Sequence, residues 1–99
     1  MKIGIGNDTA GTTLKYIILE HLKAKGFEVI DFGAASGETV EYPTAAKTVS
    51  EAVLKGEVDK GILLCATGIG ISMAANKIKG IRAALCADSY SAKMAAEHT

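Results

Sequence analysis

Residues 63–72 read LLCATGIGIS, an apolar run that ends on a cysteine and passes at once into a loop with two glycines. The apolar run is typical of a buried strand, and the residues after Gly70 are typical of a helix. Glycine lets the backbone approach a ligand closely, because it carries no Cβ atom. The stretch therefore predicts a strand, a loop and a helix in succession, with Cys65 at the strand end beside a place where a ligand can bind.

The same alternation of strand and helix runs along the whole chain. Short apolar runs predict strands at 2–6, 27–33, 59–65 and 80–86. Patterns with apolar residues three or four apart predict helices at 12–26, 44–56, 70–80 and 89–98. Gly26 and Gly56 are expected to end the first two helices, and Asp88 or Ser89 to cap the start of the last.

This order predicts an α/β fold made of one domain over residues 1–99. Right-handed crossovers and the need to cover both faces favour a doubly wound, Rossmann-like parallel sheet with strand order 2-1-3-4. Ligands of such sheets bind beyond the carboxyl ends of the strands. Asp8, Cys65 and Cys86 each follow a predicted strand, so we expect all three near the same edge of the sheet.

Composition excludes several classes of function. Eleven Lys and Arg balance eleven Asp and Glu, which argues against nucleic acid as a partner. The sequence has no apolar stretch near the ~20 residues of a membrane span, so a cytoplasmic protein without membrane contact is expected. The two cysteines are expected to be reduced, with Cys86 in the core.

The loop CATGIG, residues 65–70, carries the chemistry that the sequence predicts. The following helix would turn its unpaired N–H groups and its positive dipole end toward the loop, which stabilises an anion. A cysteine at a helix N-terminus favours the thiolate, so Cys65 could act as a base or a nucleophile. A buried structural cysteine beside a tight turn is the alternative interpretation.

Three familiar loops fit these residues poorly. A Walker loop would need Lys after its second glycine, and a cysteine phosphatase loop would need Arg at the same position, where Ile71 stands. The stretch also resembles the phosphocysteine loop of sugar-phosphotransferase carriers. Those carriers place the cysteine after the first strand, whereas Cys65 follows the third.

Several stretches together match one family of enzymes: IGNDTAGTTLK (5–15), GFEVIDFG (26–33), EYP (41–43) and GEVDKGILLCATGIGISMAANKIKGIRAALCADSYSAKMAAEH (56–98). On these residues the chain resembles the type B ribose-5-phosphate isomerases and the related galactose-6-phosphate isomerase subunits. The resemblance implies aldose–ketose interconversion of a phosphorylated sugar through an enediolate, as in the pentose phosphate pathway. It implies neither a metal nor an organic cofactor.

The resemblance also implies roles for particular residues. Cys65 would take the proton from the carbon next to the carbonyl, while Thr67 and the amides of 68–70 would stabilise the oxyanion. His98 would assist ring opening by proton transfer. The residues implied to bind the substrate, with Asp8 on the sugar hydroxyls, are Asp8, Thr9, Tyr42, Ala66, Gly68, Ile69, Gly70 and Thr99.

The chain departs from the family pattern at both ends of the site. Thr9 stands where the family usually has His, and Thr99 stands where it usually has Asn. Family members continue with a fifth strand, a C-terminal helix and basic residues that hold the phosphate, and these are expected to be lacking here. We therefore expect turnover to be absent or far below that of a full-length relative. His98 could equally be a solvated residue at a helix end. His21 is expected to be a solvated surface residue.

A second hypothesis is a catalytically impaired or engineered assembly module. Without a fifth strand, the run 81–86 would be an exposed apolar edge that can pair with another chain. Residues 16–19 form four consecutive apolar positions, more than one buried helix face can use. A homo-oligomer, with a two-fold dimer as the default, is therefore expected. Alanines expected at surface or loop positions point the same way: Ala34, Ala35, Ala45, Ala95 and Ala96.

Overall fold

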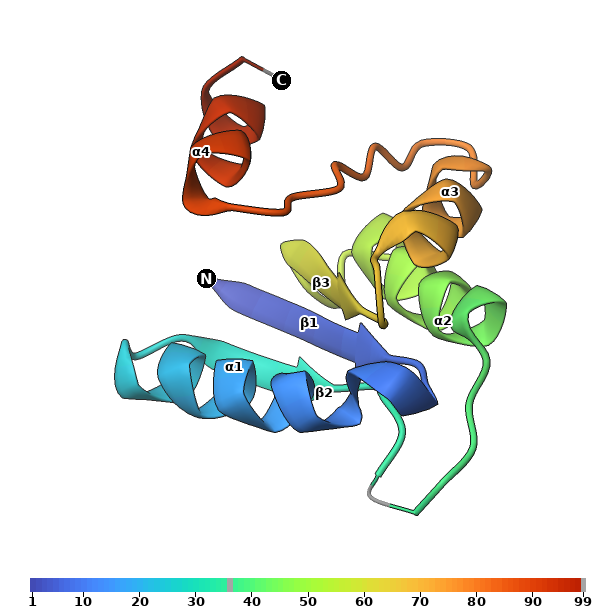
Figure 1. Cartoon of the computed structure of the whole chain (residues 1–99). Helices are drawn as coiled ribbons and strands as arrows, with labels where there is room; N and C mark the ends of the chain where they lie inside the picture. Colours follow the sequence, from blue (N-terminus) through green and yellow to red (C-terminus); the bar gives the residue numbers. More distant parts are fainter. Residues whose placement is uncertain (36, 99) are drawn as a thin grey trace.

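The computed structural model of the chain describes residues 1–35 and 37–98 (Figure 1). The strands of this part are β1 (Lys2–Asn7), β2 (Glu28–Asp31) and β3 (Lys60–Leu64). The helices are α1 (Thr12–Ala24), α2 (Tyr42–Leu54), α3 (Ile69–Asn76) and α4 (Ser89–His98), and a 3-10 turn, η1 (Thr9–Gly11), precedes α1. Within these ranges no helix is both long enough and apolar enough to cross a membrane. The α/β class predicted from the sequence is confirmed.

The strands form a parallel sheet in the order β2-β1-β3. Ile3 of β1 pairs with Val29 of β2, and Ile5 pairs with Ile62 of β3. Helices α1 and α2 cover opposite faces of this sheet (Figure 1), so the side chains of the central strand are buried whichever way they point. The predicted order 2-1-3 is therefore confirmed for these three strands, with β1 in the centre.

Helix α2 packs directly against the backbones of two strands because glycines leave room for it. A Cβ atom at Gly6 would lie 2.5 Å from a methyl carbon of Val49, and one at Gly61 would lie 2.6 Å from the other methyl carbon. Ala45 is also buried on α2, and Ala34 is buried after β2. The expectation of a surface or loop position is wrong for Ala45, which is buried in a helix, whereas Ala34 lies in a loop as expected and is buried there. The small side chains let neighbouring elements approach closely.

The predicted helix ends are confirmed at three places. Gly26 follows α1 with φ at +88°, and Gly56 follows α2 with φ at +76°, a region that favours glycine. Asp88 caps α4, since its carboxylate accepts the backbone N–H of Ser91 at 2.7 Å. These local signals are sufficient to end or begin a helix wherever the tertiary structure permits one.

The segment 80–86, predicted as a fourth strand, forms no strand within the described residues. Its backbone is tied to α3 instead, because the side-chain amide of Asn76 bonds to both polar backbone groups of Ala83. These are groups that a neighbouring strand would otherwise use. In the described part of the chain β3 therefore has β1 as its one sheet neighbour, and its other edge borders a hollow of about 880 Å³.

Beyond this segment the chain leads to α4, which stands apart from the sheet in Figure 1 and has no buried residue. Cys86 is exposed, so the prediction that it lies in the core is wrong. The thiol is exposed because no strand pairs with its segment and encloses it. Both cysteines are free, as predicted, and His21 is exposed on α1, also as predicted.

Candidate active site

Cys65 lies where β3 ends and the chain turns into α3. Gly68 takes a φ of +79° at the start of this helix, a conformation that favours glycine. The turn brings the N–H of Gly68 within 2.9 Å of Cys65 Sγ, to which it donates. The N–H of Ile69 donates to Thr67 Oγ1 at 3.1 Å. Side chains of the loop therefore accept the first N–H groups of α3.

This geometry stabilises negative charge at the turn. A backbone N–H that donates to an acceptor and the positive end of a helix both favour an anion in the same place. Leu85 lies against the turn, since a Cβ at Gly68 would be only 2.6 Å from its Cδ1 atom.

Asp8 is held beside this turn by β1. Its backbone N–H donates to the carbonyl of Leu64 at 3.1 Å, one residue before the cysteine. Its Oδ1 accepts the N–H of Gly11 at 3.0 Å and so caps η1. Gly11 is needed here, because a Cβ would lie 2.4 Å from the carbonyl oxygen of Leu64. The structure therefore brings Asp8 and Cys65 to the same edge of the sheet, as predicted.

The hydroxyl group of Thr9 is engaged with the loop between β2 and α2. Thr9 Oγ1 accepts the N–H of Val40 at 2.9 Å and lies 3.2 Å from the carbonyl oxygen of Val40, to which it can donate. The backbone N–H of Thr9 also donates to that carbonyl, at 3.0 Å. Thr9 thus joins η1 to the loop.

Tyr42, the first residue of α2, lies over the loop that follows Cys65. A Cβ at Gly70 would be 3.0 to 3.3 Å from carbons of the tyrosine ring, so the glycine is the residue that permits this approach. Tyr42 is exposed, and Ala66 and Ile69 are exposed on the same turn as Cys65. These predicted site residues therefore share the carboxyl edge of the sheet with Asp8.

Two of the predicted site residues lie elsewhere or outside the described part. His98 is the last residue of α4 and is exposed. Figure 1 shows the C-terminal end of α4 far from the turn between β3 and α3. Thr99 lies outside the described residues. The structure therefore does not bring His98 to Cys65.

Two buried polar residues near this edge were not predicted from the sequence. Asn7 is fully buried, and its Nδ2 donates to the carbonyl of Asp8 at 2.9 Å and to Thr12 Oγ1 at 3.0 Å. Lys15 is fully buried in α1. A signal for Lys15 was available, because it lies four residues after Gly11 and seven before Leu22, on the stripe that faces the sheet. No comparable pattern distinguishes Asn7.

Among the described residues, no group of three or more His, Cys, Asp and Glu side chains is arranged to hold a metal ion. The polar groups at this edge include the thiol, the hydroxyl of Thr67, the carboxylate of Asp8 and backbone N–H groups. Such a set can accept and return a proton and can stabilise an oxyanion.

Known proteins resemble this chain along nearly its whole length. The family model described as Ribose/Galactose Isomerase matches residues 3–99. Ribose-5-phosphate isomerase B of Escherichia coli is 52% identical over 97 residues, which cover 98% of this chain and 65% of that protein. The galactose-6-phosphate isomerase subunit LacB of Clostridium acetobutylicum is 47% identical over 98 residues, which cover 99% of this chain and 57% of that protein.

The fold is shared as well. The solved structure of Clostridium thermocellum ribose-5-phosphate isomerase B superposes with a TM-score of 0.95 at 56% identity, covering 99% of this chain and 66% of that one. The chain therefore spans between 57% and 66% of the length of these three relatives.

Proposed function

Because this chain belongs to the ribose/galactose isomerase family, we propose that it interconverts the aldose and ketose forms of a phosphorylated sugar. Ribose 5-phosphate and ribulose 5-phosphate are the first pair to test, since the E. coli relative is a ribose-5-phosphate isomerase. The observation that carries the proposal is the donation of the Gly68 N–H to Cys65 Sγ at the start of α3. It supports a base and an oxyanion site in one turn.

In the proposed reaction Cys65, as a thiolate, removes the proton from the carbon next to the substrate carbonyl. The electron pair of that C–H bond forms a carbon–carbon double bond, and the carbonyl oxygen becomes the enediolate oxygen. Thr67 and the amides of residues 68–70 then donate to this oxygen, which stabilises the charge that develops. For this the N–H groups of Gly68 and Ile69 turn to the oxygen from Cys65 Sγ and Thr67 Oγ1, their acceptors in the free protein, and Sγ needs its donor less once the thiolate has taken the proton. The thiol then returns its proton to the former carbonyl carbon, while a hydroxyl proton moves between the two oxygens.

The other side chains of this edge would hold the sugar. Asp8 has a carboxylate that can accept sugar hydroxyl groups, and Tyr42 offers a ring and a hydroxyl beside Gly70. Thr9 would act on the substrate through the loop that it binds. The proposal assigns no role to a metal ion or an organic cofactor, because the thiol and the N–H groups supply both the proton transfer and the charge stabilisation.

The test measures transfer of the proton as well as formation of the product. The chain is incubated with ribose 5-phosphate in D₂O, and both ribulose 5-phosphate formation and deuterium at the reacting carbon are measured. We expect exchange that Cys65→Ala abolishes and Cys86→Ala leaves intact. Turnover is expected to be well below that of the E. coli relative, because His98 lies far from the turn. Exchange that survives Cys65→Ala would refute the assigned base.

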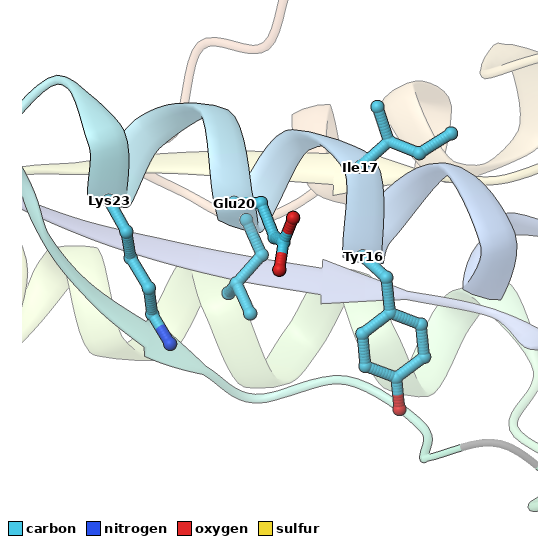
Figure 2. Close-up of a pocket in the computed structure, with 5 residues that line it drawn as sticks. Tyr16, Ile17, Glu20 and Lys23 are labelled. Atoms are coloured by element: carbon cyan, nitrogen blue, oxygen red, sulfur yellow. The ribbon is translucent and has the colours of Figure 1, made fainter.

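A second candidate function, assembly into an oligomer, rests on the outer face of α1. Tyr16 is 41% exposed and Ile17 is 63% exposed. Figure 2 shows these side chains with Glu20 and Lys23 around a shallow hollow. Exposed apolar side chains of this size favour contact with another molecule. The proposal is a homo-oligomer, with a two-fold dimer as the default.

A further inference from the structure

Lys15 is the largest fully buried side chain of the described residues, with none of its surface exposed. Its ammonium group lies 3.1 Å from Asp31 Oδ2 and donates to the carbonyl oxygen of Ala34. It also lies 4.5 Å from the centroid of the Tyr16 ring. Figure 2 shows this ring extending from α1 toward the chain that follows β2.

Such a lysine does not contact a substrate, because no part of it reaches the surface. Stability alone is also a weak explanation, since the Asp31 side chain is 33% exposed and an ion pair open to water on one side contributes little. What the contacts do is specific: they join the middle of α1 to the first residues after β2. Asp31 Oδ1 accepts the N–H of Gly33 at 2.9 Å, so the pair fixes the direction in which the chain leaves the sheet.

The loop that starts there runs to the candidate active site. Its far end is held by Thr9, through the hydrogen bonds to Val40. Val40 packs against the same buried cluster as Cys65. Tyr42 follows two residues later and lies over Gly70. The described residues of this loop, 33–35 and 37–41, are therefore anchored at their two outer ends, by Lys15 and by Thr9, and Val40 at the second anchor packs on the same cluster as Cys65.

We propose that Lys15 is a positioning residue of the substrate site, which acts through Asp31 and Ala34 on the loop that ends at Tyr42. That this site binds a substrate rests on the proposed function, whereas the anchoring of the loop by Lys15 does not. With Lys15 in place the loop presents Val40 and Tyr42 to the turn at Cys65. Without it the first anchor is lost, and the loop opens while the sheet stays intact.

The first measurement needs no ligand. Amide hydrogen exchange is followed by NMR in the wild type, in Lys15→Met and in the double variant Lys15→Met with Asp31→Asn, which leaves no unpaired charge. We expect exchange at the Val40 amide to become about ten-fold faster or more in both variants, with the β1 amides nearly unchanged. Lys2→Met is the matched control, because it removes another lysine that pairs across β1 and β2, with Glu28.

The outcomes distinguish a positioning role of Lys15 from a purely structural one. Exchange at Val40 that stays within two-fold of the wild type, or that rises together with the β1 amides, overturns the proposal. If both Lys15 variants fail to fold, Asp31→Asn alone is measured, with selective acceleration at Gly33 and Val40 expected. Unfolding of all three variants shows a purely structural role and also overturns it.

The second measurement is the affinity for ribose 5-phosphate, from shifts of the Cys65 and Gly68 amide signals during a titration. The Kd is expected to rise about ten-fold or more in Lys15→Met, because the loop would then have to be ordered when the substrate binds. Deuterium exchange at saturating substrate should stay within two-fold of the wild type. A wild type that fails to bind would refute the proposed function and leave the exchange result at Val40 to decide the role of Lys15.

Discussion

The side-chain amide of Asn76 pairs with the backbone of Ala83 at both ends: Oδ1 accepts the N–H and Nδ2 donates to the carbonyl, each at 2.7 Å. The Asn76 side chain therefore makes the two backbone hydrogen bonds at Ala83 that a neighbouring strand would otherwise make. It connects the end of α3 to a segment whose last residues, from Ala84 to Cys86, are exposed.

Asn76→Ala should release this segment from α3. We expect a loss of about 1 kcal/mol in the free energy of unfolding, since both hydrogen bonds are partly open to water. Urea unfolding with an unchanged m-value would measure it. Asn76→Asp is the matched variant, because it keeps the acceptor for the Ala83 N–H and loses only the donor. Equal stability of Asn76→Ala and the wild type would contradict the role of this contact.

The two thiols should respond differently to substrate. Cys86 is exposed and lies within reach of an alkylating reagent. Cys65 is half-buried in the proposed site. Ribose 5-phosphate is expected to slow alkylation of Cys65 by iodoacetamide and to leave Cys86 unaffected. Mass spectrometry of the labelled peptides measures both rates, with Cys86→Ser as the control. Equal protection of both thiols, or of neither, would count against the site.

Thr9 should contribute to stability through its hydroxyl group. Thr9→Val keeps the shape of the side chain and removes the contacts to Val40, so we expect the free energy of unfolding to fall by about 1 kcal/mol. Thr9→Ser retains the hydroxyl and should stay close to the wild type. Chemical denaturation of the three proteins compares them, and a Thr9→Val variant as stable as Thr9→Ser would show that the hydroxyl does not anchor the loop.

The start of α4 should depend on pH. The backbone N–H and then the hydroxyl of Ser91 lower the pKa of Asp88 below its ordinary value of 3.8. Because the folded pKa is depressed, the capping contribution is present above the unfolded pKa and is lost as the pH falls through the folded value. Chemical shifts of residues 89–98 should report a stable helix at neutral pH and fraying below about pH 4. Asp88→Asn, which keeps an acceptor, should remove this pH dependence.

The outer face of α1 gives a test of assembly. Light scattering at micromolar concentration should detect a specific oligomer, and Ile17→Lys should weaken it if this face is the interface. Thr48→Lys adds the same charge at an exposed position of α2, away from this face, and serves as the control. A charged residue at Ala84 tests the segment after α3 in the same way. A monodisperse monomer in the wild type would refute the assembly hypothesis.

The sequence was sufficient to predict the sheet but not its far edge. The apolar runs and the glycines after α1 and α2 are local signals, and β1, β2 and β3 follow from them in the predicted order. The run 80–86 has the same local preference for a strand. Its conformation depends on Asn76, a contact between distant side-chain and backbone groups that propensity does not report.

The candidate site was also predicted only in part. A cysteine at a strand end followed by two glycines predicted the turn between β3 and α3, because this combination of residues is uncommon outside such turns. The loop anchored by Thr9 and Lys15 was missed, since a hydroxyl can bond to many groups and a lysine is usually exposed. The spacing from Gly11 and Leu22 places Lys15 on the side of α1 that faces the sheet, and the packing of α1 shows that its side chain is enclosed.

Among the residues that the structure describes, β3 has no strand on its outer edge, which also affects how the protein behaves in concentrated solution. Lysine and arginine together equal aspartate and glutamate in number, so near neutral pH the molecules have no net charge with which to repel one another. An unpaired row of strand N–H and carbonyl groups can then join copies edge to edge without a defined stoichiometry. Solubility is therefore expected to be lowest near neutrality and to improve as the pH moves away from it in either direction.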